Sequence, residues 1–236
     1  MIRESCAASN RGIALITVLL VASLVFVVGV GLSLVLTIGQ LVARNHRDAA
    51  ILQAAAHAGI ELTARSLADT DWQAVLQGMV VAEGADGAPA GVRLVDAAPI
   101  DLAAETHMLN CGRQTACSPA ERAAITLERP WGPNNPFWQL YLFGPLSSFA
   151  AFRFPASTYL LVWVADDGRE SDGRPEIDGG AEAGRHVLRA RAVAVGRDGA
   201  RTSVDAELVR VCLEGRAACE PGIRVQSQRE TRHAVP

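Results

Sequence analysis

An uninterrupted run of uncharged residues near the start of the chain most constrains what it can fold into. From Gly12 to Ala43 there is no Asp, Glu, Lys or Arg, and nearly every residue from Ile13 to Ile38 is apolar or small. As an α-helix this run would be about 48 Å long, at about 1.5 Å per residue. Because about 20 helical residues cross the hydrocarbon core of a bilayer, the run predicts a membrane-spanning helix.

The run does not fit a cleaved secretory signal. The apolar region of such a signal has about 7 to 15 residues and ends at a small-x-small cleavage site. Here the run is longer, and it continues into "GQLVARNH", which contains no such site. Flanking charges are nearly balanced on the two sides, so they orient the span poorly.

The pattern predicts that the same helix continues beyond the apolar run. Residues 40–72 contain no Pro and a single Gly, and Ala and Leu dominate. A break near Asp69 and a new turn at Asp71 are predicted from "ADTDW", which supplies capping residues. Together these features predict one helix of about 55 residues, apolar in its first half and amphipathic in its second. The amphipathic stripe comprises Leu41, Asp48, Ala49, Leu52, Ala55, Ala56, Gly59, Ile60, Thr63 and Leu67, with Arg44, Arg47, Glu61 and Arg65 off it.

The C-terminal half of the sequence predicts an antiparallel sheet. "STYLLVWVAD" is a compact run of β-forming residues, typical of a buried strand. "RHVLRARAVAVG" and "RTSVDAELVRVCL" alternate in polarity and are joined by "GRDGA", which predicts a hairpin. Upstream, "SPAERAAITLE" predicts a short helix capped by Ser118. The expected fold is α+β, with a long N-terminal helix packed on a C-terminal antiparallel β-sheet head.

These features together resemble the superfamily of type IV pilins and type II secretion pseudopilins. The segment "RGIALITVLLVASLV", after a short polar leader ending in Gly12, looks most like minor pilins of PilX type and the large tip pseudopilin of GspK type. "RDAAILQAAAHAGIELTARSLA" is similar to the stretch that follows in those families. The resemblance is specific over about 60 residues and architectural beyond them.

The resemblance implies that a prepilin peptidase cuts after Gly12 and that Ile13 becomes an N-methylated amino terminus. The implied location is the bacterial inner membrane, with a single span and a periplasmic head, or the tip of a pilus or pseudopilus. Implied partners are the peptidase, membrane lipid, the inner-membrane assembly platform and other minor pilins or pseudopilins. The expected parts are a leader (1–12), an assembly helix (13–43), an amphipathic extension (44–70) and an α+β head with a polar C-terminal tail (71–236).

Thr17 departs from the pattern of the major pilins, which carry Glu five residues after the cut. In those families the carboxylate is thought to neutralise the terminal ammonium of a neighbouring subunit inside the fibre. Since an unpaired buried ammonium is costly, Thr17 favours a subunit at a tip or initiation complex over a bulk fibre subunit. Small residues further along the span would permit close helix packing and mark a point of local unwinding at the first two: Gly29, Gly31, Ser33 and Gly39.

A rival hypothesis shares every feature except the processing site. It is an uncleaved single-pass envelope protein whose head binds a ligand or another protein. A net charge of −3 gives no indication of nucleic-acid binding. Catalysis has little support, because no nucleophile elbow, zinc-protease helix or phosphate loop is present.

The cysteines predict disulfides in the head. Cys6 lies in the leader, which leaves an even number in an exported domain. Three connectivities are open, and pairing within the two short loops "CGRQTAC" and "CLEGRAAC" is favoured. The spacings do not fit structural zinc sites or redox catalysts. The candidates are Cys111, Cys117, Cys212 and Cys219.

Two further stretches carry alternatives. "ADDGRESDGRPEIDGG" is rich in carboxylates that could bind calcium, but its spacing misses the calcium-hand pattern, and a solvated loop is favoured. The calcium candidates are Asp166, Asp167, Asp172 and Asp178. The stretch from residue 129 to 155 holds eight of the chain's twelve aromatic residues. It is interpreted as core of the head, with an exposed partner-binding patch as the alternative.

Overall fold

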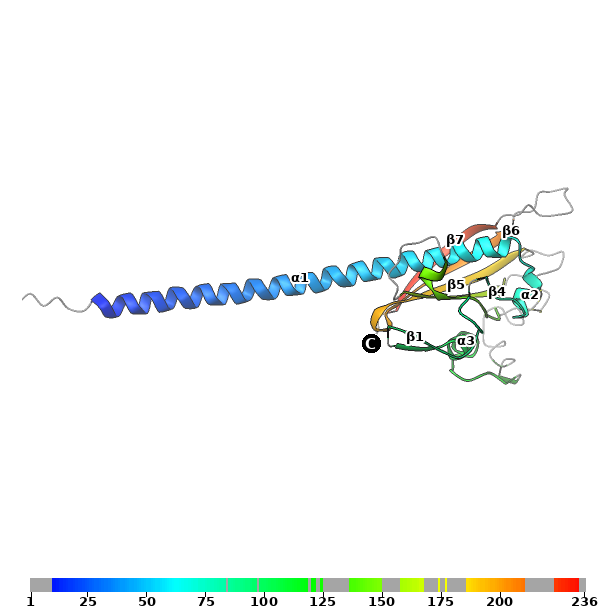
Figure 1. Ribbon diagram of the computed structural model, residues 1–236, viewed down its shortest axis with the longest axis horizontal. Helices are drawn as coiled ribbons and strands as arrows, with labels where there is room; N and C mark the ends of the chain where they lie inside the picture. The colour runs from blue at the N-terminus through cyan, green and yellow to red at the C-terminus, as the bar shows by residue number, and fades with distance from the viewer. Residues whose placement is uncertain are drawn as a thin grey trace, which may run out of the picture. The chain divides into compact units, whose positions relative to one another are not determined.

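The computed structural model describes residues 10–83, 85–96, 98–118, 120–121, 124, 136–149, 158–167, 174, 177, 186–210 and 223–233. The chain divides into two compact units, Met1–Asp48 and Ala49–Pro236. Figure 1 shows how the chain combines a long N-terminal helix with an antiparallel sheet. The expected α+β class is therefore confirmed.

Helix α1 runs without a break over Asn10–Ala68, 59 residues. It is continuous through Gly29 and Gly31, so the expected unwinding point is regular helix. Four hydroxyls in the apolar half donate to carbonyls of the preceding turn, among them Thr17 to Ala14 at 2.9 Å and Ser33 to Gly29 at 2.9 Å. Because the helix satisfies these hydroxyls itself, they add little cost in an apolar environment.

The predicted break after α1 is confirmed. Asp71 caps the short helix α2 (Trp72–Leu76) by accepting from the Gln73 N–H. The Trp72 indole donates to the Leu67 carbonyl at 3.0 Å, and the Arg210 guanidinium lies over the indole, 4.3 Å from the ring centroid. Arg210 also donates to the Leu67 and Thr70 carbonyls. The orphan carbonyls at the end of α1 are thus satisfied by the head.

A five-stranded antiparallel sheet follows, in the order β3-β4-β5-β6-β7. The predicted buried strand and hairpin are confirmed as β4 (Tyr159–Asp166), β5 (Val187–Val195) and β6 (Arg201–Arg210). The short 3-10 helix η3 (Arg197–Gly199) forms the turn between β5 and β6. The polar stretch expected to be a tail is instead strand β7 (Ile223–His233), paired with β6 from Arg210 to Arg201. Strand β3 (Gln139–Pro145) and the 3-10 helix η2 (Leu146–Phe149) lie within the aromatic-rich stretch.

One face of the sheet packs against the amphipathic part of α1. Residues of the predicted stripe from Leu52 to Leu67 are buried, whereas Leu41, expected to begin the stripe, is exposed. Glu61 and Arg65 are exposed, as the pattern predicts. The helix from Ala49 onward belongs to the compact unit of the head, so the amphipathic segment builds the head's core.

Gly59 lies where α1 closely approaches the sheet. A Cβ atom at this position would come within 2.8 Å of Leu160 Cδ1 and 3.3 Å of the Ala192 Cβ. Glycine is therefore required by packing, although it lowers helix propensity.

We expect Gly59→Val to destabilise the head by about 1–3 kcal/mol, because overpacking forces side chains or backbone to move. Gly31→Val is the control for the intrinsic cost of valine in the helix, since a Cβ at Gly31 meets nothing within 4 Å. Chemical unfolding of the full-length protein in detergent measures both. Equal unfolding midpoints for the two variants would contradict the close approach at Gly59.

The opposite face of the sheet is covered by a second layer. It consists of the hairpin β1 (Val92–Val95) and β2 (Ala98–Asp101), followed directly by helix α3 (Leu102–Cys111). Successive side chains of β4 point to opposite faces of the sheet. Leu160 and Val162 pack on the α1 side, while Leu161 and Trp163 pack with the hairpin and α3. The head therefore has a central sheet between two layers.

The aromatic-rich stretch contributes to this core where the structure describes it. Trp138, Tyr141 and Phe143 are buried, and Phe149 packs on the core's edge. This confirms the core interpretation for these residues. Trp131, Phe152 and Phe154 lie outside the described residues, as does Cys6.

Candidate functional site

The apolar half of α1 is the first candidate functional element. Every described side chain from Ala14 to Ala43 is exposed, and the large apolar ones are 48–72% exposed. Within the described residues, one helix is long and apolar enough to cross a membrane; its most apolar 18-residue window has a mean hydropathy of 2.8. So large an apolar surface requires lipid or other helices to cover it. The apolar half of α1 could therefore span a membrane, which is consistent with single-pass anchoring.

The predicted processing and assembly residues all lie on this helix. Gly12 and Ile13 are in its first turns, and Thr17 follows one turn later. A Cβ atom at Gly29, Gly31 or Gly39 would meet nothing within 4 Å. The chain's own packing therefore does not require glycine at these three positions, in contrast to Gly59.

A disulfide closes the loop at the end of α3. Cys111 is the last residue of the helix, Gly112 ends it in the left-handed conformation with φ 69°, and Cys117 pairs with Cys111. This confirms the first predicted disulfide. Cys212 and Cys219 lie outside the described residues, so their pairing stays a prediction.

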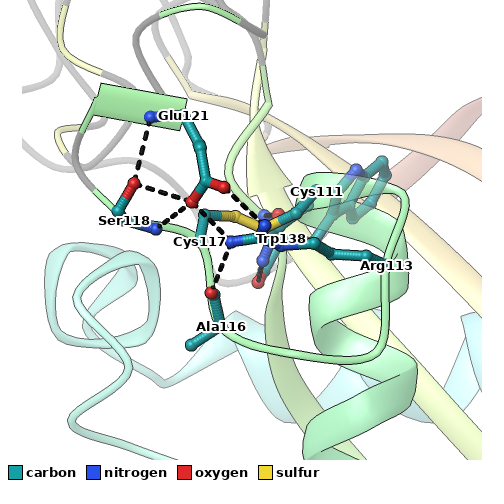
Figure 2. Close-up of a disulfide and its surroundings, with 8 residues drawn as sticks. Cys111, Arg113, Ala116, Cys117, Ser118, Glu121 and Trp138 are labelled. Carbon is teal, nitrogen blue, oxygen red and sulfur yellow. Dashed lines mark hydrogen bonds and ion pairs between the residues drawn. A yellow bond between two sulfur atoms is a disulfide. The ribbon is translucent and has the colours of Figure 1, made fainter.

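Figure 2 shows the polar network around this disulfide. Arg113 forms a two-pronged ion pair with the Glu121 carboxylate and donates to the Ala116 carbonyl at 2.8 Å. Ser118 and Glu121 form a reciprocal capping box: the Glu121 N–H donates to Ser118 Oγ, and the Ser118 N–H donates to Glu121 Oε2. The predicted cap at Ser118 is thus confirmed. Hydrogen bonds from Arg113 and Ser118 lower the pKa of Glu121 to about 2.

The disulfide loop is anchored on the sheet through Trp138. The Asn110 side chain donates to the Trp138 carbonyl at 2.9 Å and accepts from the Trp138 N–H at 2.8 Å. Arg189 and Arg191 of β5 lie 5.7 and 5.6 Å from the indole centroid. Arg191 also pairs with Asp205, which raises the pKa of the guanidinium. These contacts fix α3 on the face of the sheet opposite α1.

The lowered pKa of Glu121 predicts a specific pH dependence. Its carboxylate stabilises the folded loop fully above its ordinary pKa of 4.5, and this contribution is lost as the pH falls towards 2. Glu121→Gln should remove this dependence between pH 4.5 and 2 while leaving the disulfide intact. An NMR titration of the Glu121 carboxyl checks it: a midpoint near 4.5 would contradict the network.

The calcium candidates are only partly described. Asp166 and Asp167 are buried at the end of β4, where the Asp167 N–H donates to Asp166 Oδ1 at 3.0 Å. Asp172 and Asp178 lie outside the described residues. Over the described part of the chain, no group of three or more His, Cys, Asp or Glu residues is arranged to hold a metal ion. Calcium binding by the whole stretch stays a prediction.

A surface on the β1–β2 hairpin was not found from the sequence. Val92 and Leu94 point outward and are 57% and 77% exposed, whereas the Arg93 side chain between them is 22% exposed. Pro99 and Met108 extend the exposed apolar area. We call Val92, Leu94, Pro99 and Met108, with loop 86–91, the hairpin surface. The signal in the sequence was "GAPAGVRL", in which a run of apolar and small residues contains one charge.

Comparisons of the chain with protein-family models, curated proteins and solved structures give no match.

Proposed function

We propose that this protein is a minor pilin or pseudopilin that takes part in assembling or priming a type IV pilus or type II secretion pseudopilus. The observation that carries the proposal is helix α1. Its first part exposes only uncharged residues from Ala14 to Ala43, and its last part packs on an antiparallel sheet. This division suits a subunit that is held in a membrane and then leaves it to pack against other helices.

The length of the apolar run supports packing against protein as well as lipid. At about 1.5 Å per residue the 32 uncharged residues span about 48 Å, against about 30 Å of hydrocarbon. Tilting of the helix in the bilayer accounts for part of this difference between helix length and hydrocarbon thickness. Glycines at positions 29, 31 and 39, which the isolated chain does not require for its own packing, would let neighbouring helices approach closely.

Thr17 supports a position at the tip. Its hydroxyl donates to Ala14 O within its own helix, and it carries no charge to neutralise a neighbour's ammonium. A subunit that lacks this carboxylate would add poorly to the end of a growing stack, because the ammonium would be buried without an anion. We therefore place it where no equivalent subunit stacks on it.

The copy number in the fibre tests this role. In the source bacterium, deleting the gene should abolish or strongly reduce fibres or secretion, and restoring it should recover them. Quantitative mass spectrometry of sheared fibres should find a few copies of the protein per fibre. Abundance equal to the major subunit would contradict the tip position, and normal assembly without the gene would contradict the function.

A further inference from the structure

Strand β1 of the hairpin turns apolar side chains to solvent and a charged side chain inward, the reverse of the usual arrangement. Surface hairpins normally turn apolar residues to the core and charged residues to water. In β1, Val95 is buried as expected, but Val92 and Leu94 face outward while Arg93 turns inward. An exposed apolar area with a half-buried arginine beneath it indicates a binding surface.

Arg93 holds this surface in one shape. Its guanidinium pairs with the Asp86 carboxylate at 3.1 Å and donates to the carbonyls of Asp86, Ala88 and Ala90 at 2.6, 3.1 and 3.4 Å. Three carbonyls of loop 86–91 therefore accept hydrogen bonds from Arg93, while the residues Ala88, Pro89 and Ala90 remain exposed to solvent. A loop fixed before binding loses less conformational entropy when a partner docks.

A groove of about 460 Å³ lies beside the exposed strand. Val92 and Pro99 of the hairpin and Ala104 and Met108 of α3 are among its lining residues. Four polar or charged residues complete its lining: Asp101, Glu105, Gln114 and Arg201. Met108 is 45% exposed. The groove is large enough to take an apolar side chain of a partner, which is the usual form of an interface anchor.

The charges around the groove select the kind of partner. Among the charged residues that line the groove, Arg201 pairs with Glu105, which leaves the negative charge of Asp101 without a matching positive charge in the lining. The Asp101 carboxylate caps α3 through Oδ1. A surplus negative charge disfavours nucleic acid and anionic lipid, both of which recruit arginine or lysine clusters. It favours a protein that carries a cation.

We propose that the hairpin surface binds a second protein, whose apolar side chain enters the groove between Val92 and Met108 and whose Lys or Arg pairs with Asp101. The inference goes beyond the proposed function and does not rest on it, because every observation comes from the head. The apolar contacts provide the affinity, and the charge fixes the orientation.

Photo-crosslinking in the source membranes tests the proposal on the full-length chain. A benzoylphenylalanine replaces exposed Ala88, in loop 86–91 of the hairpin surface. We expect an adduct with one other protein, at a peptide that has an apolar residue next to Lys or Arg. Val92→Thr and Met108→Gln should each lower the yield about tenfold, as expected for losing one apolar anchor. Met79→Gln, an exposed apolar residue outside the hairpin surface, should leave the yield unchanged.

Asp101→Asn isolates the charge, because asparagine caps a helix about as well as aspartate. The yield should fall and lose its dependence on salt. Adducts only with lipid or with a second copy of this chain, no adduct, or an adduct insensitive to Val92→Thr and Met108→Gln would each overturn the proposal. Unfolding midpoints of the variants separate loss of binding from loss of fold. Leader removal, followed in the same cells, tests the proposed function independently.

Discussion

Gly12→Val is expected to leave the leader on the protein, with no detectable mature form. The proposed cut follows Gly12, and we expect the peptidase to require a small residue at this position. Valine is larger and β-branched, so it should prevent the cut. The retained leader keeps charged residues ahead of the apolar run in the sequence, including Arg3 and Arg11. Because these charges would be expensive to bury among packed apolar helices, the variant should stay in the membrane and be absent from fibres.

Gly31→Val is the matched control for Gly12→Val. It makes the same substitution in the same helix, at a position where a Cβ atom meets nothing within 4 Å. Its leader should be removed normally. Immunoblots of membrane and sheared-fibre fractions follow both variants. If the wild-type protein and Gly12→Val migrate identically at the full-length mass, the chain is not processed there and the uncleaved envelope protein becomes the better account.

Trp72→Ala should have the largest effect on stability, lowering the free energy of unfolding of the head by about 3–5 kcal/mol. The indole is only 2% exposed and packs between α1 and the sheet. Its loss leaves a cavity, removes the hydrogen bond to the Leu67 carbonyl, and removes the aromatic face under Arg210. Chemical unfolding of the full-length protein in detergent measures the change.

Met79→Ala controls for the loss of a large apolar side chain. Met79 is 67% exposed, so its replacement should change the free energy of unfolding by no more than about 0.5 kcal/mol. If Trp72→Ala costs no more than Met79→Ala, the junction of α1, α2 and β6 does not contribute to stability as the structure indicates.

Long elements with a clear hydrophobic period were predictable from the sequence. The helix up to Ala68 and its end at the Asp71 cap follow from periodicity and capping, and the β5–β6 hairpin follows from alternation around "GRDGA". The Cys111–Cys117 pair follows from their short spacing. The ion pair between Arg113 and Glu121 required the geometry of the folded loop.

Elements with a short or mixed pattern were missed for physical reasons. Strands β1 and β2 have four residues each, too few to show a period. In β1 the apolar Val92 and Leu94 are exposed and Arg93 turns inward, so its polarity pattern predicts the wrong face as buried. Strand β3 is buried on both faces, which removes alternation. Strand β7 is mostly polar in sequence and is defined by its backbone pairing with β6. Helix α3 had usable signals, since Asp101 caps its start and Gly112 ends it.

The N-terminal sequence and intact mass of the protein, purified from the membranes of its source, test the central claim most directly. The account predicts a chain that begins at N-methylated Ile13 and lacks residues 1–12. A chain that begins at Met1, with the mass of all 236 residues, would contradict the pilin assignment and leave a membrane-anchored protein whose head binds a partner.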